Sequence, residues 1–139
     1  MIHEEICTYE VCKLAKAKRF PQHPNGSFDC CYYHWDRLRK IHSLCSSKVY
    51  YDDEFRQRDL FRAPTQSLLQ RWLREEKGIT ICVDIFDDGW FFDISTFYKQ
   101  DTGVYEVDIP YKSSNVSHVF DSYELALEDA LKYALENLV

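Results

Sequence analysis

The strongest constraint on the fold is a strictly alternating run, ITICVDIF at residues 79–86. Apolar side chains occupy every second position of this run, and threonine, cysteine and aspartate lie between them. Successive side chains of a strand point to opposite faces, so this period predicts a strand with one buried face and one polar face. The Asp-Asp-Gly sequence at 87–89 predicts a hairpin turn directly after it. The run therefore favours an antiparallel sheet that is covered on one face only.

Two more strands are predicted to extend this sheet into a meander. Residues 90–98 alternate in the same way, with Trp90, Phe92 and Ile94 on the side to be buried. A third strand over residues 104–109 follows the Asp-Thr-Gly turn at 101–103, with its apolar positions expected to face the same side.

Two helices flank the predicted strands. The first opens at Pro64 and Thr65 and ends at Gly78, a residue type that caps helix C-termini. The second begins at an Asp-x-x-Glu capping box, formed by Asp121 and Glu124, and runs to about residue 138. Both helices carry apolar stripes to cover the sheet, at Leu68, Leu69, Trp72 and Leu73 in the first and at Leu125, Ala126, Ala130, Leu131, Ala134 and Leu135 in the second.

The first half of the chain shows a helix followed by a strand. Thr8 is the expected N-cap of a helix that runs to about Arg19. The sequence FDCCYYHW at 28–35 is rich in strand-forming aromatic residues. A short helix over 38–44 and a short strand over 49–55 are further expectations.

A chain of 139 residues has room for one domain of ordinary size. We therefore expect a single α+β domain over residues 1–139. Residues 64–139 would form a helix–three-stranded antiparallel meander–helix core, and residues 1–63 an N-terminal helix and short strand elaboration of it.

Aromatic residues make up 16% of the chain, and there are only four glycines and four prolines. This composition excludes a disordered or collagen-like chain.

The charge of the chain is unevenly distributed. The net charge of −6 combines +2 for residues 1–63 with −8 for residues 64–139. The order helix, three strands, helix is that of double-stranded RNA-binding domains, which hold phosphates with lysines at the start of the last helix. Here that helix carries four carboxylates and one lysine, at Glu124, Glu128, Asp129, Glu136 and Lys132. We expect no binding of double-stranded RNA, because carboxylates repel phosphate.

The N-terminus predicts neither a signal peptide nor a membrane anchor. Glu4, Glu5 and Glu10 interrupt any apolar run there, and no stretch of the chain reaches the ~18 uncharged apolar residues of a membrane span. A cytoplasmic location is expected, where cysteines stay reduced. The six cysteines therefore do not predict a disulfide framework.

Zinc binding is a hypothesis that these cysteines raise. Cys31 and His34 have the close spacing of a zinc-ligand pair, and Cys7 with Cys12 is a looser second pair. Cys30 would point away from Cys31 on a strand. Buried or half-buried thiols are the preferred interpretation, so no metal ligand is assigned.

Carboxylates are predicted to gather on the polar side of the sheet, at Asp84, Asp93, Glu106 and Asp108. Carboxylates on neighbouring strands can hold Mg²⁺ and support phosphodiester hydrolysis. The sheet offers no histidine or lysine beside them as base or cationic stabiliser, so a solvated face is preferred. The chain also lacks a Gly-x-Ser-x-Gly elbow, a phosphate-cradling loop and a cofactor fingerprint. We therefore expect neither catalytic residues nor a cofactor, and a protein that is not an enzyme.

Phe91 and Phe97 alternate with Asp93 and Ser95, so they are expected on the face away from the helices. They either pack against tyrosines of the first half, at Tyr32, Tyr33, Tyr50 and Tyr51, or form an exposed aromatic patch ringed by acid. Such a patch would suit a protein partner. The candidate interaction surface is Asp84, Phe91, Asp93, Phe97, Glu106 and Asp108.

Three segments carry a resemblance to other proteins. They are TYEVCKLAKAKRF (8–20), APTQSLLQRWLREEKGITI (63–81) and FDSYELALEDALKYALENL (120–138). With its APTQ helix start and its Tyr-Glu-rich closing helix, the chain resembles a group of short proteins encoded by gut bacteria and their phages or prophages. The group has no established activity, so the resemblance implies relatives but no reaction and no functional residue.

The preferred hypothesis is a small non-enzymatic protein-interaction factor, in one variant a polyanion mimic whose carboxylates imitate phosphates. The first alternative is a metal-dependent phosphodiesterase or nuclease that uses the same acids. The second is a binder of single-stranded nucleic acid, through aromatic and basic residues of the first half at Tyr32, Tyr33, Lys13, Lys16, Arg37, Arg39 and Lys40.

Overall fold

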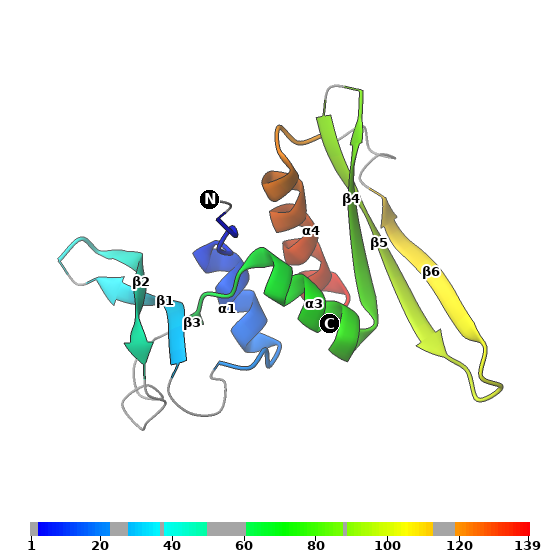
Figure 1. The fold of residues 1–139 in the computed structure, drawn as a ribbon, viewed down its shortest axis with the longest axis horizontal. Coiled ribbons are helices and arrows are strands. Elements are labelled where there is room, and N and C mark those ends of the chain that lie inside the picture. Colours follow the sequence, from blue (N-terminus) through cyan, green and yellow to red (C-terminus); the bar gives the residue numbers. More distant parts are fainter. Residues whose placement is uncertain (1–2, 23–27, 37, 50–60, 88, 113–118) are drawn as a thin grey trace. The chain divides into compact units, whose positions relative to one another are not determined.

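The computed structural model describes residues 3–22, 28–36, 38–49, 61–87, 89–112 and 119–139. Figure 1 shows the elements in chain order, α1, β1, β2, β3, α3, β4, β5, β6 and α4. The helices and the two antiparallel sheets confirm the predicted α+β class. The chain forms two compact units, of which one is Ile6–Thr65 and the other is Met1–Glu5 together with Gln66–Val139.

In the part of Ile6–Thr65 that the structure describes, there are one helix and a sheet of three strands in the order β2-β1-β3. Its elements are α1 (Tyr9–Ala17), β1 (Phe28–Asp36), β2 (Ile41–Val49) and β3 (Phe61–Arg62). As predicted, α1 begins after Thr8, whose hydroxyl accepts a hydrogen bond from the Val11 N–H at 3.5 Å.

The predicted helix over 38–44 is wrong, because most of this segment belongs to strand β2. β2 pairs with β1 over its whole length, from Asp36 opposite Ile41 to Phe28 opposite Val49. The tight turn between them contains Lys40 at φ 55, a conformation more often adopted by glycine or asparagine. The predicted strand over 49–55 lies, beyond Val49, outside the described residues.

A cluster of aromatic rings packs within this unit, beside the buried side chains of Val11, Ala15 and Phe61. The Tyr9 ring stacks on His42 at a centroid distance of 3.9 Å. The same ring meets Tyr33 at 5.7 Å and Phe61 at 5.4 Å, both edge to face. The Tyr33 hydroxyl also donates to the Cys7 carbonyl at 3.0 Å. Part of the aromatic content of the chain thus stabilises its interior.

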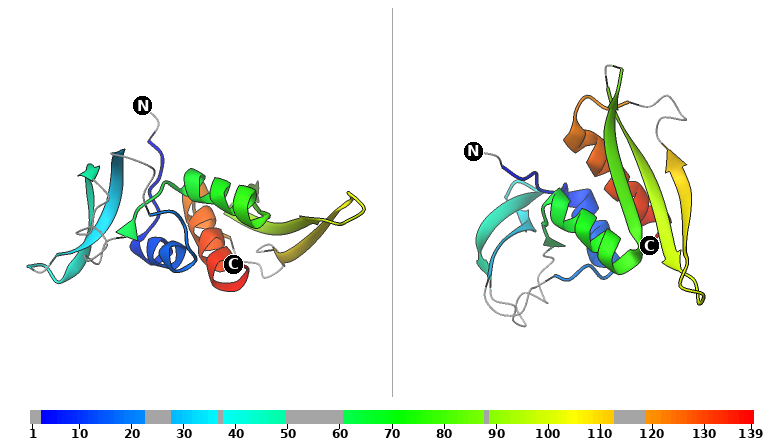
Figure 2. Two further views of the ribbon diagram at one scale, coloured as in Figure 1. Left: turned by 90° about the horizontal axis from the view of Figure 1, so that it is seen from below. Right: turned by 45° about the vertical axis from the view of Figure 1, so that its right-hand side comes forward.

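The second unit contains the predicted helix, meander and helix. Its elements are α3 (Gln66–Lys77), β4 (Ile79–Phe86), β5 (Gly89–Lys99), β6 (Tyr105–Lys112) and α4 (Tyr123–Asn137). The three strands form an antiparallel sheet in the order β4-β5-β6. Figures 1 and 2 show α3 and α4 on the same face of this sheet. We call this the inner face.

The inner face holds the core of the second unit. Ile79, Ile81, Phe92 and Ile94 are at most 4% exposed there, as the alternation predicts. They meet fully buried leucines and alanines of the two helices: Leu69, Leu73, Ala126, Ala130, Leu131, Ala134 and Leu135. Each fully buried Leu, Ile or Phe side chain contributes about 1.5–3 kcal/mol, so this layer is a main source of stability.

Helix α4 differs in two details from its prediction. Its N-cap is Ser122 and not Asp121, because the Ser122 hydroxyl accepts from the Leu125 N–H at 3.1 Å. Leu125, expected to be buried, is 54% exposed, and Leu127 is buried in the stripe instead. A serine hydroxyl caps as well as a carboxylate, so two adjacent candidates could not be ranked by type.

Candidate functional site

The face of the β4-β5-β6 sheet opposite the helices carries the predicted aromatic and acidic residues. Asp84 lies opposite Phe91 and Cys82 lies opposite Asp93 in the β4–β5 register, and residues that lie opposite each other share a face. Phe92 is buried on the inner face, so its neighbours Phe91 and Asp93 belong to the other face. We call this the outer face, formed by Thr80, Cys82, Asp84, Phe91, Asp93, Ser95, Phe97, Lys99, Tyr105, Val107 and Lys112.

The register separates the four predicted carboxylates into two pairs. Glu106 lies opposite Tyr98 and Asp108 lies opposite Thr96, which are inner-face positions of β5. Asp84 and Asp93 lie on the outer face. The expectation that all four share one polar face is therefore wrong, and so is the inward direction expected for Val107.

A bulge in β6 explains this correction. Ile94 pairs with Tyr111 and Thr96 pairs with Asp108. The two paired positions are therefore three residues apart on β6 but only two residues apart on β5. One extra residue inverts the faces of every position before it along the strand. Pro110 lies within the bulged segment and is the sequence signal for it, because a proline inside a strand marks an edge or a bulge.

Glu106 lies beside the turn of the β5–β6 hairpin, and this end of the hairpin extends past both helices in Figures 1 and 2. Its carboxylate accepts hydrogen bonds from the Tyr98 hydroxyl and from the Gln100 side-chain amide. Glu106 thus holds the end of the hairpin together. Asp108 is exposed on the same strand.

Phe91 and Phe97 are half-buried on the outer face, and Val107, opposite Phe97, is 66% exposed. Phe97 and Val107 form a short apolar strip, whereas Phe91 lies six residues, about 20 Å, away along β5 beyond Asp93 and Ser95. Of the tyrosines considered as its cover, Tyr50 and Tyr51 lie outside the described residues. Tyr33 donates its hydroxyl to the Cys7 carbonyl inside the other unit.

Asp93 lies on the middle strand of the outer face. Its Oδ1 is buried, and no described residue donates a hydrogen bond to it. A buried carboxylate oxygen without a donor costs free energy, about 1–3 kcal/mol or more. The neighbour opposite Asp93 on β4 is Cys82, an exposed free cysteine. On its other side, Asp93 lies opposite Lys112 of β6.

Asp84 is exposed but carries a local hydrogen bond. Its Oδ1 accepts from the backbone N–H of Ile85 at 2.8 Å. Ile85 itself is 57% exposed. The Asp84 Oδ1 therefore already accepts a hydrogen bond from a backbone group of its own strand.

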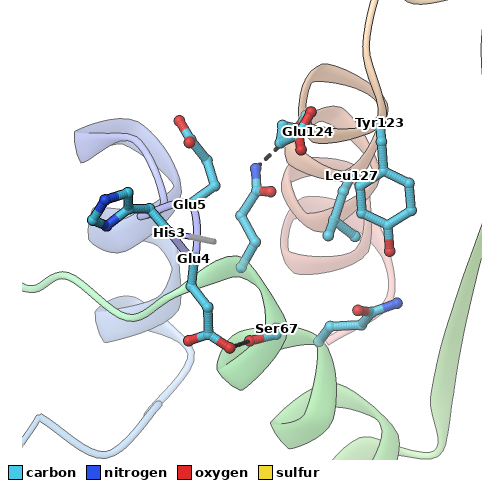
Figure 3. A pocket seen from close by; sticks show the side chains of 9 residues that line it. His3, Glu4, Glu5, Ser67, Tyr123, Glu124 and Leu127 are labelled. Carbon is cyan, nitrogen blue, oxygen red and sulfur yellow. Dashed lines mark hydrogen bonds between the residues drawn. The ribbon is translucent and has the colours of Figure 1, made fainter. Parts of the chain in front are cut away.

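A pocket of about 160 Å³ lies in the second unit between the N-terminal segment, α3 and α4. Figure 3 shows its acidic lining, with Glu4 and Glu5 on the N-terminal segment and Glu124 on α4. The Glu4 carboxylate accepts a hydrogen bond from the Ser67 hydroxyl at 3.1 Å. A carboxylate is favourable there because the N-terminal end of helix α3 has a partial positive charge.

Gln66 is the buried polar residue beside this pocket, with 4% exposure. Its Nε2 donates to the Glu124 carbonyl at 3.0 Å and to Glu128 Oε2 at 2.8 Å, and its backbone N–H donates to the Glu5 carbonyl. Gln66 thereby joins the N-terminal segment, α3 and α4. This role was not predictable from the sequence, because a glutamine at a helix start is ordinarily exposed.

Tyr111 on β6 has a perturbed ionisation. Its ring stacks on Phe92 at 5.2 Å and meets Tyr133 at 4.2 Å. Burial raises the pKa of Tyr111 above its ordinary value, and the nearby charges of Asp129 and Tyr133 raise this pKa further. The protonated phenol is the form that the fold favours.

The cysteines of the zinc hypothesis are only partly described. Cys7 and Cys12 are buried, and the Cys12 Sγ lies 3.6 Å from the Cys7 carbonyl. The side chains of Cys30, Cys31, His34 and Cys45 lie outside the described part. Among the described residues, no three His, Cys, Asp or Glu side chains gather in a way that would hold a metal ion.

Comparisons with protein-family models, curated proteins and solved structures find no match to this chain. The likeness of the α3–β4–β5–β6–α4 order to double-stranded RNA-binding domains therefore stays a prediction. None of the helices that the structure describes combines the length and the apolar character needed to cross a membrane.

Proposed function

We propose that this chain is a small non-enzymatic protein-interaction factor, from a phage or another mobile element, whose outer face binds a partner protein. The observation that carries the proposal is the exposure of Val107, 66%, beside Phe97 on the outer face, with Phe91 farther along the same face. Both helices of this unit lie on the inner face. Aromatic residues contribute strongly to protein interfaces, since they bury much area at little entropic cost.

The charge of residues 64–139 as a whole favours a partner of positive charge. These residues carry 14 carboxylates against 6 lysines and arginines. On the outer face itself, the register places Lys99 and Lys112 with Asp84 and Asp93. Complementary charge also speeds the encounter of two proteins.

No observation favours the alternatives to the same degree. The polyanion mimic and the nuclease both need the four carboxylates together, whereas Asp84 and Asp93 lie on the opposite face from Glu106 and Asp108. For single-stranded nucleic acid, Tyr33 would have to offer its ring, but it packs edge to face on Tyr9.

Site-specific photo-crosslinking in host cells tests the proposal. A benzoylphenylalanine at position 91 lies on the outer face, and one at Leu125, on an exposed helix position, is the matched control. We expect one dominant protein adduct from position 91 that is missing from position 125. Identical adducts at both positions, or none at 91, would contradict the proposal.

A further inference from the structure

Strand β4 is an edge of its sheet. The order β4-β5-β6 places β5 on one side of β4 and no described strand on the other. The Phe97 N–H donates to the Gly78 carbonyl. Hydrogen-bonded pairs alternate along an antiparallel ladder, so Thr80, Cys82 and Asp84 bond to β5. The intervening residues Ile81, Val83 and Ile85 therefore direct their backbone N–H and C=O groups to the open edge.

Two side chains form hydrogen bonds with backbone groups on this open edge. The Gln70 Nε2, from α3, donates to the Ile81 carbonyl at 2.9 Å. The Asp84 Oδ1 accepts from the Ile85 N–H at 2.8 Å. The Ile81 carbonyl and the Ile85 N–H lie on either side of Val83 along the strand. A strand that pairs with β4 beyond Val83 in either direction therefore finds a backbone group that is already hydrogen-bonded.

The edge needs such protection because little else in β4 deters pairing. An open edge with β-branched residues is a template for another strand. The β4 sequence ITICVDIF has no proline and no lysine, whereas the opposite edge strand β6 contains Pro110 and a bulge. Ile85 also presents an apolar side chain that is 57% exposed.

We propose that Gln70 and Asp84 close the β4 edge against pairing with a second copy of this chain. Two copies of β4 can pair antiparallel about Val83, since Val83 of each copy would exchange both backbone hydrogen bonds with the other. In that register the Ile85 N–H of one copy faces the Ile81 carbonyl of the other. These are the two groups that Asp84 and Gln70 occupy within one chain.

Substitutions at Asp84 separate hydrogen bonding from charge. Asp84→Ala removes the acceptor and the charge, whereas Asp84→Asn removes the charge but keeps a side-chain oxygen that accepts from the Ile85 N–H. Sedimentation velocity over a concentration series measures self-association, and amide hydrogen exchange at Val83 reports whether the edge is paired. Asp84 is exposed, so both variants are expected to fold.

The double variant Gln70→Ala/Asp84→Ala is expected to self-associate at least about tenfold more tightly than the wild type, because each dimer gains two hydrogen bonds worth about 1 kcal/mol each. Its Val83 amide should become protected as the concentration rises. Asp84→Asn should behave as the wild type, and Asp84→Ala or Gln70→Ala alone should associate less than the double variant, because one partner of each bond stays occupied. The proposal is overturned if the double variant stays like the wild type, if Asp84→Asn associates equally, or if association leaves the Val83 amide unprotected.

Discussion

The carbonyl oxygen of Phe97 lies 2.6 Å from the position that a Cβ atom on Gly78 would occupy. Gly78 ends α3 at φ +66, and its own carbonyl accepts from the Phe97 N–H. The chain therefore turns from α3 into β4 so close to β5 that only a residue without a side chain fits.

Gly78→Ala is expected to destabilise the protein by about 2 kcal/mol or more, since the left-handed backbone costs an alanine about 1–2 kcal/mol and the contact with Phe97 adds to it. Gly103 is the matched control. It has φ +85 but no atom within 4 Å of an added Cβ, so Gly103→Ala has only the backbone cost. Urea unfolding of both variants measures the difference. Equal losses would show that the Phe97 contact is unimportant.

Replacement of Gln66 by methionine should cost about 1–3 kcal/mol of unfolding free energy. Methionine keeps the length of the side chain but cannot donate to the Glu124 carbonyl or to Glu128, and the second of these bonds involves a charge. Ser67→Ala removes an exposed bond to Glu4 and should cost no more than about 0.5 kcal/mol. If the two variants unfold alike, Gln66 does not join α3 to α4.

Alkaline pH should destabilise the fold through Tyr111. Its pKa is higher in the folded state than in the unfolded chain, so the folded state holds the proton more tightly. The resulting stability is complete below the unfolded pKa of about 10 and is lost as the pH rises through the folded value. Tyr111→Phe cannot ionise, and its unfolding free energy should fall less than that of the wild type between pH 8 and pH 11. Parallel pH curves would contradict this role of Tyr111.

Val107→Glu should weaken binding of the partner while leaving the fold intact. Val107 is 66% exposed in the apolar strip, so a carboxylate there is solvated in the free protein but desolvated under a partner. The adduct yield from benzoylphenylalanine at position 91 should drop at least about tenfold. Leu125→Glu adds the same charge at an exposed helix position and should leave the yield unchanged. Equal effects of the two variants would point to net charge alone.

The periodic parts of this fold were predictable from the sequence. Buried Ile79, Ile81, Phe92 and Ile94 follow from a period of two, and the cap at Thr8 follows from hydroxyl chemistry. The β1–β2 hairpin was not predictable, because its turn uses Lys40 at a positive φ in place of an Asn-Gly or Gly signal. A local propensity cannot show which neighbour a strand will pair with.

The candidate site was predictable only on the β4–β5 side. Asp84, Phe91, Asp93 and Phe97 share a face because both strands keep an unbroken alternation. Across β5–β6 the extra residue near Pro110 inverts the faces, so Glu106 and Asp108 change sides and Val107 takes an outer position. The alternation of apolar and polar residues does not reveal a single inserted residue. Pro110 is the only signal for it, because a proline inside a strand marks an edge or a bulge.

The first five residues belong to the same unit as Gln66–Val139, and Ile6–Thr65 lies between them in the sequence. Its two ends are adjacent, since the Cys7 N–H donates to the Pro64 carbonyl and Ile6 bridges Thr65. Directly outside those ends, the Gln66 N–H donates to the Glu5 carbonyl. The smaller unit is therefore an insertion in the chain of the larger unit, between Glu5 and Gln66. In evolutionary terms, a gene could gain, lose or exchange residues 6–65 as one block while Glu5 and Gln66 remain neighbours in the fold that carries the outer face.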